Sequence, residues 1–120
     1  MAVGNVTAPT TAGTIRAAAD IIAFATSDER LKGNKVLLTE ALDKVNQLGG
    51  YEFDWIPMAG IHENEGHDIG VIAQEVEKIV PDAVSTRDNG YKAVKYEKLI
   101  PLLIEAIKEL SAEIDKLKGK

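Results

Sequence analysis

Residues 97–118, EKLIPLLIEAIKELSAEIDKLK, carry the most regular pattern in the chain. Apolar residues recur there at alternating spacings of three and four, which is the a/d seam of a coiled coil. Six residues make up this seam: Ile100, Leu103, Ile107, Leu110, Ile114 and Leu117. An isolated helix would leave the stripe in water, so we expect copies of the chain to associate through it. Isoleucine at a with leucine at d favours two strands.

The positions beside the seam add two predictions. Glu113 at g and Lys118 at the following e can pair between parallel helices. Near the start of the helix, the apolar face widens through Leu102, Ile104 and Ala106. We therefore expect this end of the helix to pack on the rest of the domain as well.

A helix and a strand are predicted in the first half of the domain. Thr39 is a candidate N-cap for a helix over 40–48, where apolar residues fall at helical spacing. Gly49-Gly50 then ends that helix. Residues 51–56 alternate strictly and place three aromatic side chains on one face. We expect this aromatic strand to carry the core of the small domain.

A loop, a helix and a hairpin are predicted next. Residues 57–70 are rich in glycine and charge and are typical of a loop. A short amphipathic helix is expected over 71–80, and its buried residues are Ile72, Val76, Ile79 and Val80. The Asn89-Gly90 pair predicts a β-hairpin between 83–86 and 91–96. The fold class is therefore α+β, with a long C-terminal helix.

The N-terminal arm differs in character from this domain. Residues 1–13 are small and polar, with too little apolar bulk to fold alone. Residues 14–26 place alanine and isoleucine at every second position, the period of a strand. Such a thin face must pack against copies of itself or another body. An alanine-rich helix over 15–25 is the alternative.

Composition narrows the classes of function. The 120 residues include 19 acidic and 14 basic side chains, a net charge of -5, which argues against a nucleic-acid binder held by phosphate contacts. The absence of cysteine excludes disulfides and thiolate metal sites. No apolar run approaches the roughly 20 residues that span a bilayer. Ala23-Phe24-Ala25 imitates a signal-peptide cleavage site, but no basic region precedes it. We expect a protein made in the cytoplasm, with no membrane or nucleic-acid partner.

The loop over 57–70 holds residues that could ligate a metal, but we do not predict a metal site. These residues are His62, Glu63, Glu65, His67 and Asp68. Zinc sites do use histidine and carboxylates. Here all of them lie on one loop without a second anchoring pair, so a solvated loop is favoured and no cofactor is expected. Glu75 and Glu77 could supply a catalytic carboxylate, although an exposed helix face is favoured for them.

The sequence TSDERLK, residues 26–32, separates the arm from the domain. It begins with Thr26 and Ser27, and Lys32 follows the serine five residues later. On spacing alone, Ser27-Asp28 is a helix N-cap and Lys32 a solvated surface charge.

An ordered set of motifs changes that interpretation. They are GTIR at 13–16, DIIAF at 20–24, SDERLK at 27–32, ALDKV at 41–45, GVIAQEVE at 70–77, GYKAV at 90–94 and YEKLIPLLIEAIK at 96–108. Together they resemble the intramolecular chaperone domains of phage tail spikes and fibres, the peptidase S74 family. The resemblance covers about residues 13–110, and the ordered set is more specific than any one of its pieces.

The resemblance implies a C-terminal domain that trimerises, helps an upstream tail fibre or spike to fold, and then cuts itself free. The scissile bond would be Thr26–Ser27, with Ser27 and Lys32 as a catalytic dyad. Residues 1–26 would be the end of the fibre arm and 27–120 the chaperone domain. The protein would act in the virion tail fibre or in the host cytoplasm during assembly. The family's trimers override the two-strand preference of the seam.

A related processing domain occurs in myelin regulatory factor, a membrane-anchored transcription factor. Nothing in this chain resembles the DNA-binding or membrane parts of that protein.

Such a dyad makes chemical demands. A serine hydroxyl needs a base, and lysine is a base only when neutral, so its pKa must fall from about 10.4. Arg30 is the nearest candidate cation, and trimer packing could supply desolvation. Positions five apart on a regular helix point about 140° apart. Either the segment is not helical, or Lys32 acts on Ser27 of another subunit.

Two further functions remain open beside self-cleavage. The same fold could serve uncleaved, as a structural or adhesive tip of a tail fibre. A generic coiled-coil adaptor without a phage connection is disfavoured by the ordered motifs.

Overall fold

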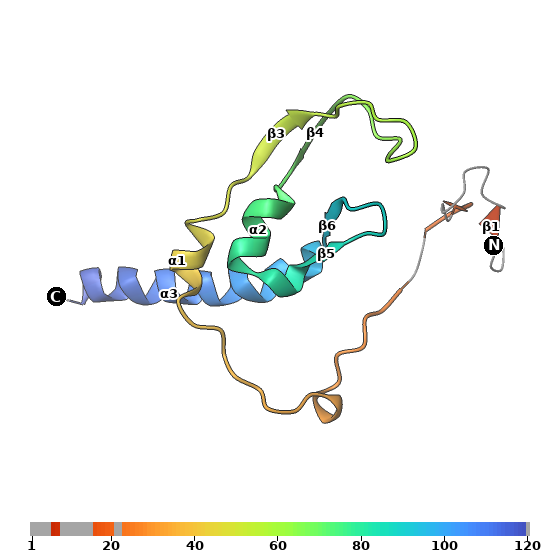
Figure 1. The fold of residues 1–120 in the computed structure, drawn as a ribbon. Coiled ribbons are helices and arrows are strands. Elements are labelled where there is room, and N and C mark those ends of the chain that lie inside the picture. Colours follow the sequence, from red (N-terminus) through yellow and green to blue (C-terminus); the bar gives the residue numbers. More distant parts are fainter. Residues whose placement is uncertain (1–5, 8–15, 21–22, 120) are drawn as a thin grey trace. The chain divides into compact units, whose positions relative to one another are not determined.

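The structure is a computed structural model that describes residues 6–7, 16–20 and 23–119 (Figure 1). The chain divides into two compact units, residues 1–35 and 36–120. Among the described residues, no helix is both long enough and apolar enough to cross a bilayer.

The first unit has little regular structure in its described part. Strand β1 (Val6–Thr7) pairs antiparallel with β2 (Arg16–Ala17), and a 3-10 helix, η1 (Glu29–Leu31), lies further along. The strand predicted over 14–26 is therefore too long, because its other described residues belong to no strand. None of them is helical either, so the alternative helix is also wrong there. Residues 14, 15, 21 and 22 lie outside the described residues.

The second unit is built on the C-terminal helix. Helix α3 (Ile100–Lys118) continues from the 3-10 helix η3 (Tyr96–Leu99), which confirms the helix predicted from the heptad pattern. Helix α1 (Ala41–Val45) packs across α3 (Figure 1). Their contact forms the first part of the core, in which Ala41, Leu102 and Ala106 are buried against Leu42, Val45, Leu48 and Val80.

Helix α2 (Ala73–Ile79) and the 3-10 helix η2 (Pro81–Ala83) complete the core. Val76, Ala83 and Leu99 are buried there, and Leu48 and Val80 also contact the first cluster. Burial of Val76 confirms the amphipathic helix. Ile72, however, is 41% exposed, because it precedes the helix in an extended conformation instead of lying on its buried face.

Two antiparallel hairpins extend from these helices. Strands β5 (Val84–Thr86) and β6 (Lys92–Val94) pair as predicted. Gly90 closes their turn with φ +86° and donates its amide to the Arg87 carbonyl at 2.8 Å. A positive φ at this position suits glycine, which has no Cβ.

The second hairpin corrects two predictions. Strand β3 (Tyr51–Asp54) pairs with β4 (His67–Gly70), so the end of the expected loop is a strand. The aromatic face of β3 does not carry the core either. Phe53 and Trp55 are half-buried and pack edge to face at 5.0 Å between ring centroids. The hairpin projects away from α3 (Figure 1), so this aromatic pair lies outside the two clusters of buried residues.

Candidate functional site

A tight turn shapes the segment between Ser27 and Lys32. The carbonyl of Asp28 accepts the Leu31 amide at 3.0 Å, and that of Glu29 accepts the Lys32 amide at 3.1 Å. These two bonds define η1, after which Lys32 returns to an extended conformation. Only one 3-10 turn separates Asp28 from Lys32, so the geometry of a continuous α-helix does not apply.

The Asp28 side chain holds this turn in place. Its carboxylate accepts the Arg30 amide at 2.8 Å, Arg30 Nε at 3.0 Å and Arg30 Nη2 at 3.1 Å. The side-chain contact with Arg30, and then the backbone contact, lowers the pKa of Asp28. The same pairing raises the pKa of Arg30. The cap of this turn is thus Asp28 and not Ser27.

The turn brings the two predicted dyad residues together. Lys32 Nζ lies 2.5 Å from Ser27 Oγ, within hydrogen-bonding distance and within one chain. A neutral lysine could accept the serine proton from this position, whereas a protonated lysine donates to the hydroxyl. Ser27 directly follows the Thr26 carbonyl, so the hydroxyl is also adjacent to the predicted scissile bond.

The charges around the pair differ from the expected arrangement. Arg30, expected to act as a cation near Lys32, has its guanidinium bound to Asp28. A different cation, Lys35, lies near Lys32. Its Nζ donates to the Lys32 carbonyl at 3.4 Å and lies 3.9 Å from a Glu29 carboxylate oxygen. Asp28 was expected only as part of a Ser27-Asp28 N-cap, and Lys35 had no assigned role in the sequence. Aspartate before a short helix is a recognisable cap signal, but nothing local identifies Lys35.

The turn is open to solvent in a single chain. Every residue from Ala23 to Glu40 is exposed. The exposed set includes apolar side chains beside the dyad, since Phe24 is 92% and Leu31 72% accessible. Among the described residues, none buries the side chain of Lys32.

The predicted seam of α3 is also uncovered. Its six residues are between 45% and 81% exposed: Ile100, Leu103, Ile107, Leu110, Ile114 and Leu117. The opposite face behaves differently, because Leu102 and Ala106 are buried against α1. One face of α3 thus belongs to the core, and the other presents an unpaired apolar stripe.

Glu109 links α3 to α1 in a way that the sequence did not indicate. Its two carboxylate oxygens accept the Ala41 and Leu42 amides, each at 2.9 Å. These backbone bonds, with Leu42 the larger contributor, lower the pKa of Glu109. The prediction of Thr39 as N-cap is wrong: Glu40 takes that place, with φ 54° and no side-chain cap, and Glu109 caps the amides instead.

The histidines and α2 carboxylates have structural partners. His67 contacts Asp54 through Nδ1 and Glu52 through Nε2, both at 3.0 Å, which raises the pKa of His67. No group of three potential metal ligands occurs within the part of the chain that the structure describes. Glu75 accepts the Tyr51 hydroxyl and Glu77 pairs with Lys92, so both are half-buried instead of freely exposed.

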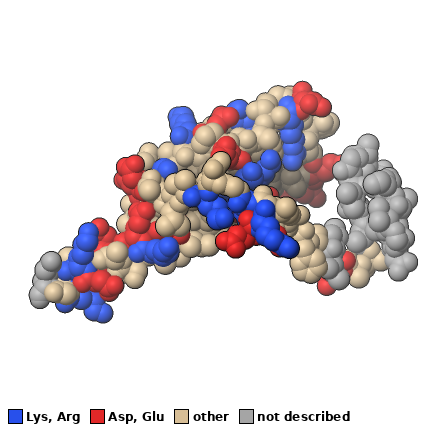
Figure 2. Space-filling model, turned by 90° about the horizontal axis from the view of Figure 1, so that it is seen from below, with Lys and Arg blue, Asp and Glu red and all other residues tan. Residues whose placement is uncertain are grey.

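Charge on the surface is mixed. On the face shown in Figure 2, Lys and Arg side chains are interspersed with Asp and Glu side chains. Phosphate recognition instead uses a basic patch or stripe, so the described residues of this face do not resemble one.

Comparison with known proteins supports the resemblance seen in the sequence. Residues 27–85 match the model of the Peptidase_S74 family, described as the chaperone of endosialidase. The chain is 36% identical over 98 residues to long tail fiber protein Gp37 of Enterobacteria phage K3, and covers 8% of that protein with 78% of its own length. It is 38% identical over 96 residues to Gp37 of phage M1, covering 38% of that relative with 77% of its own length.

A third relative comes from a cellular organism. Myelin gene regulatory factor-like A of Dictyostelium discoideum is 33% identical over 94 residues, which are 66% of this chain and 10% of the relative. The chain therefore spans well under half of the length of each of these relatives.

Proposed function

We propose that this chain, whose residues 27–85 belong to the peptidase S74 family, is the C-terminal intramolecular chaperone of a phage tail fibre or spike. It trimerises through α3, assists folding of the fibre segment that ends at Thr26, and releases itself by cutting the Thr26–Ser27 bond. Residues 1–26 are then the end of the fibre arm, and residues 27–120 the chaperone domain. The contact between Lys32 Nζ and Ser27 Oγ, directly after that bond, is the observation that supports this proposal most strongly.

The proposed reaction uses Ser27 as nucleophile and Lys32 as base. Ser27 Oγ attacks the carbonyl carbon of Thr26 while its proton passes to neutral Lys32 Nζ. The C–N bond then breaks, and the amine of Ser27 leaves with the proton that Lys32 returns. The product is an ester between Thr26 and Ser27 Oγ. Water hydrolyses this ester and leaves a Thr26 carboxylate and a Ser27 with a free amine.

Trimerisation supplies what a single chain lacks. Lys32 must lose its proton, and burial is one way to favour the neutral form of a lysine. The apolar side chains that flank the dyad, Phe24 and Leu31, are exposed in the single chain and offer a surface for a second chain to cover. Cleavage therefore waits for assembly, which makes it a check on correct folding.

The base acts within its own chain in this proposal, since the dyad contact needs only η1. Mixed trimers of Ser27→Ala chains and Lys32→Ala chains test the point. We expect no cleavage, because each chain lacks one member of its own pair. Recovery of cleavage in the mixture shows instead that Lys32 serves a neighbouring subunit.

Intact-mass analysis of the purified chain tests the proposal as a whole. Wild type should yield a fragment that begins at Ser27, and the Ser27→Ala chain should remain whole. The competing function, an uncleaved trimeric tip of a tail fibre, predicts identical masses for both chains. A monomer in light scattering contradicts both functions, since each needs the seam of α3.

A further inference from the structure

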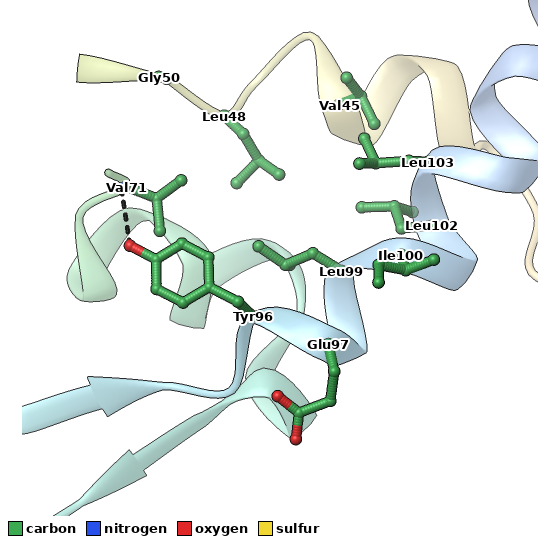
Figure 3. A pocket seen from close by; sticks show the side chains of 11 residues that line it. Val45, Leu48, Gly50, Val71, Tyr96, Glu97, Leu99, Ile100, Leu102 and Leu103 are labelled. Atoms are coloured by element: carbon green, nitrogen blue, oxygen red, sulfur yellow. Dashed lines mark hydrogen bonds between the residues drawn. The ribbon is translucent and has the colours of Figure 1, made fainter. Parts of the chain in front are cut away.

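An apolar groove lies beside the first turns of α3 (Figure 3). It has a volume of about 640 Å³ and is lined almost entirely by aliphatic and aromatic carbon. Leu99 comes from the end of η3 and Ile100 and Leu103 from the start of α3. Val45 and Leu48 face them from the end of α1 and the turn that follows. The Glu97 carboxylate points away from the other side chains in Figure 3, so its charge does not enter the groove.

One end of the groove is fixed by Tyr96. Its hydroxyl accepts the Val71 amide at 3.1 Å, which holds the ring across the opening between the two segments (Figure 3). The lining residues are therefore anchored: Leu99 by its burial in the core, Tyr96 by this bond, and Leu48 by packing against both core clusters. The groove is a preformed feature of the second unit.

The groove adjoins the predicted seam. Ile100 and Leu103 are its first a and d residues, and both also line the groove. In the same numbering Leu99 is a g residue and Ile104 an e residue. Ile104 is 52% exposed and lies outside the a/d seam, on the side of α3 opposite to α1. The same helix end thus presents an apolar side chain on one flank and an apolar groove on the other.

Parallel coiled-coil geometry relates these two features. The g residue of one helix faces the e residue five positions further along the neighbouring helix, the offset that also relates Glu113 to Lys118. Leu99 is therefore placed opposite Ile104 of the next copy. Around a closed ring of copies, each chain both offers its Ile104 and receives one.

We propose that the groove is the docking site for a second copy of this chain, which inserts Ile104 and the first turn of its α3 beside Leu99. This inference rests on the proposed trimer and deepens it, because it assigns the register and direction of association. A short seam of six residues leaves register weakly specified, and an apolar side chain that fits a preformed groove at one end removes the ambiguity.

Cysteine cross-linking tests the docking directly, because the chain contains no native cysteine. Full-length Val45→Cys and Ile104→Cys chains, both carrying Ser27→Ala so that they stay whole, are co-expressed with different tags and oxidised. We expect a disulfide between the two kinds of chain. Lys108→Cys, an exposed position on the outer side of α3, replaces Ile104→Cys in the control and should give at least tenfold less product.

A second variant measures the contribution of the side chain. Ile104→Ser should weaken association about tenfold at each interface, as expected for loss of one buried aliphatic side chain. Ile56→Ser is the matched control, since Ile56 is 74% exposed and lies outside α3. It should leave association unchanged.

The outcomes separate this inference from the proposed function. A trimer in light scattering that neither cross-links above the Lys108→Cys control nor responds to Ile104→Ser overturns the docking site and leaves the trimer standing. A wild-type chain that stays monomeric overturns both.

Discussion

The turn over residues 27–32, which holds Ser27 and Lys32, and the contact between α1 and α3 are stabilised in different ways. Contacts in the turn over 27–32 join residues at most five positions apart, and all of its side chains are exposed. Between α1 and α3, Glu109 accepts backbone amides 67 and 68 positions away in the sequence, and Ala41, Leu102 and Ala106 are buried. The contact between Ser27 and Lys32 thus joins residues close together in the sequence, whereas the packing of α1 on α3 joins residues far apart. In the proposed function, other chains complete the surroundings of the turn.

Of the substitutions that test this comparison, we expect the one at Lys32 to have the largest effect, on the rate of cleavage. Lys32→Ala should slow cleavage by about 10²–10⁴-fold, the usual contribution of a general base. Folding should be unaffected, because the side chain is exposed. The rate is measured by intact mass over time, and Lys116→Ala provides a control for loss of an exposed lysine. Cleavage of Lys32→Ala at the wild-type rate removes lysine from the mechanism.

A smaller effect is expected at the cap of the turn. Asp28→Ala removes the acceptor for the Arg30 amide and should slow cleavage about tenfold, as the turn is populated less often. Asp28→Asn keeps an acceptor in the same place and should stay within about threefold of wild type. Equal losses in the two variants would show that the charge of Asp28 matters, and not its capping bond.

The long-range contact between α3 and α1 is tested at Glu109, whose carboxylate accepts the Ala41 and Leu42 amides. Glu109→Gln should lower the midpoint of thermal unfolding of the domain by roughly 5 °C. The pKa of Glu109 is lowered in the folded state, so its stabilising effect is present above the ordinary glutamate pKa. That effect is lost as pH falls through the lower folded value. Wild type should therefore lose stability in acid more steeply than Glu109→Gln. Parallel pH dependence in circular-dichroism melts contradicts this role.

The smallest effect concerns the β3–β4 hairpin. The pKa of His67 is raised by Asp54 and then by Glu52, so its protonated form stabilises the hairpin. This stabilisation is present below the ordinary histidine pKa of about 6.5 and disappears as pH rises through the folded value. Because the contacts are exposed, the change should be slight. A pKa of His67 at or below the ordinary histidine value, measured by NMR titration, would contradict this prediction.

The elements predicted correctly are those with a local signature. The heptad spacing in α3 and the Asn89-Gly90 turn need no knowledge of distant residues. Strand β4 was missed because His67–Gly70 is polar and gains its structure only by pairing with β3. Thr39 was predicted as the N-cap because it directly precedes the predicted helix, but Glu109 on α3 accepts the Ala41 and Leu42 amides. A single sequence carries no signal for such a contact.

The candidate site divides in the same manner. Ser27 and Lys32 were singled out through a family resemblance, since their spacing alone favoured a surface charge. The pairing of Arg30 with Asp28 was not predicted. Arg30 lies close to both Asp28 and Lys32 in the sequence, and it was expected to act on Lys32. The groove beside Leu99 could not be predicted at all, since it is formed by segments about fifty positions apart in sequence.

The link between assembly and cleavage is tested most directly by following the Thr26–Ser27 bond in separated oligomeric fractions. Wild-type chains are fractionated by size, incubated, and measured by intact mass beside Ser27→Ala chains. The account predicts that a fragment beginning at Ser27 accumulates in the trimer fraction, and that Ser27→Ala remains whole in every fraction. Equal masses for wild type and Ser27→Ala, or equal cleavage of monomer and trimer, would contradict it.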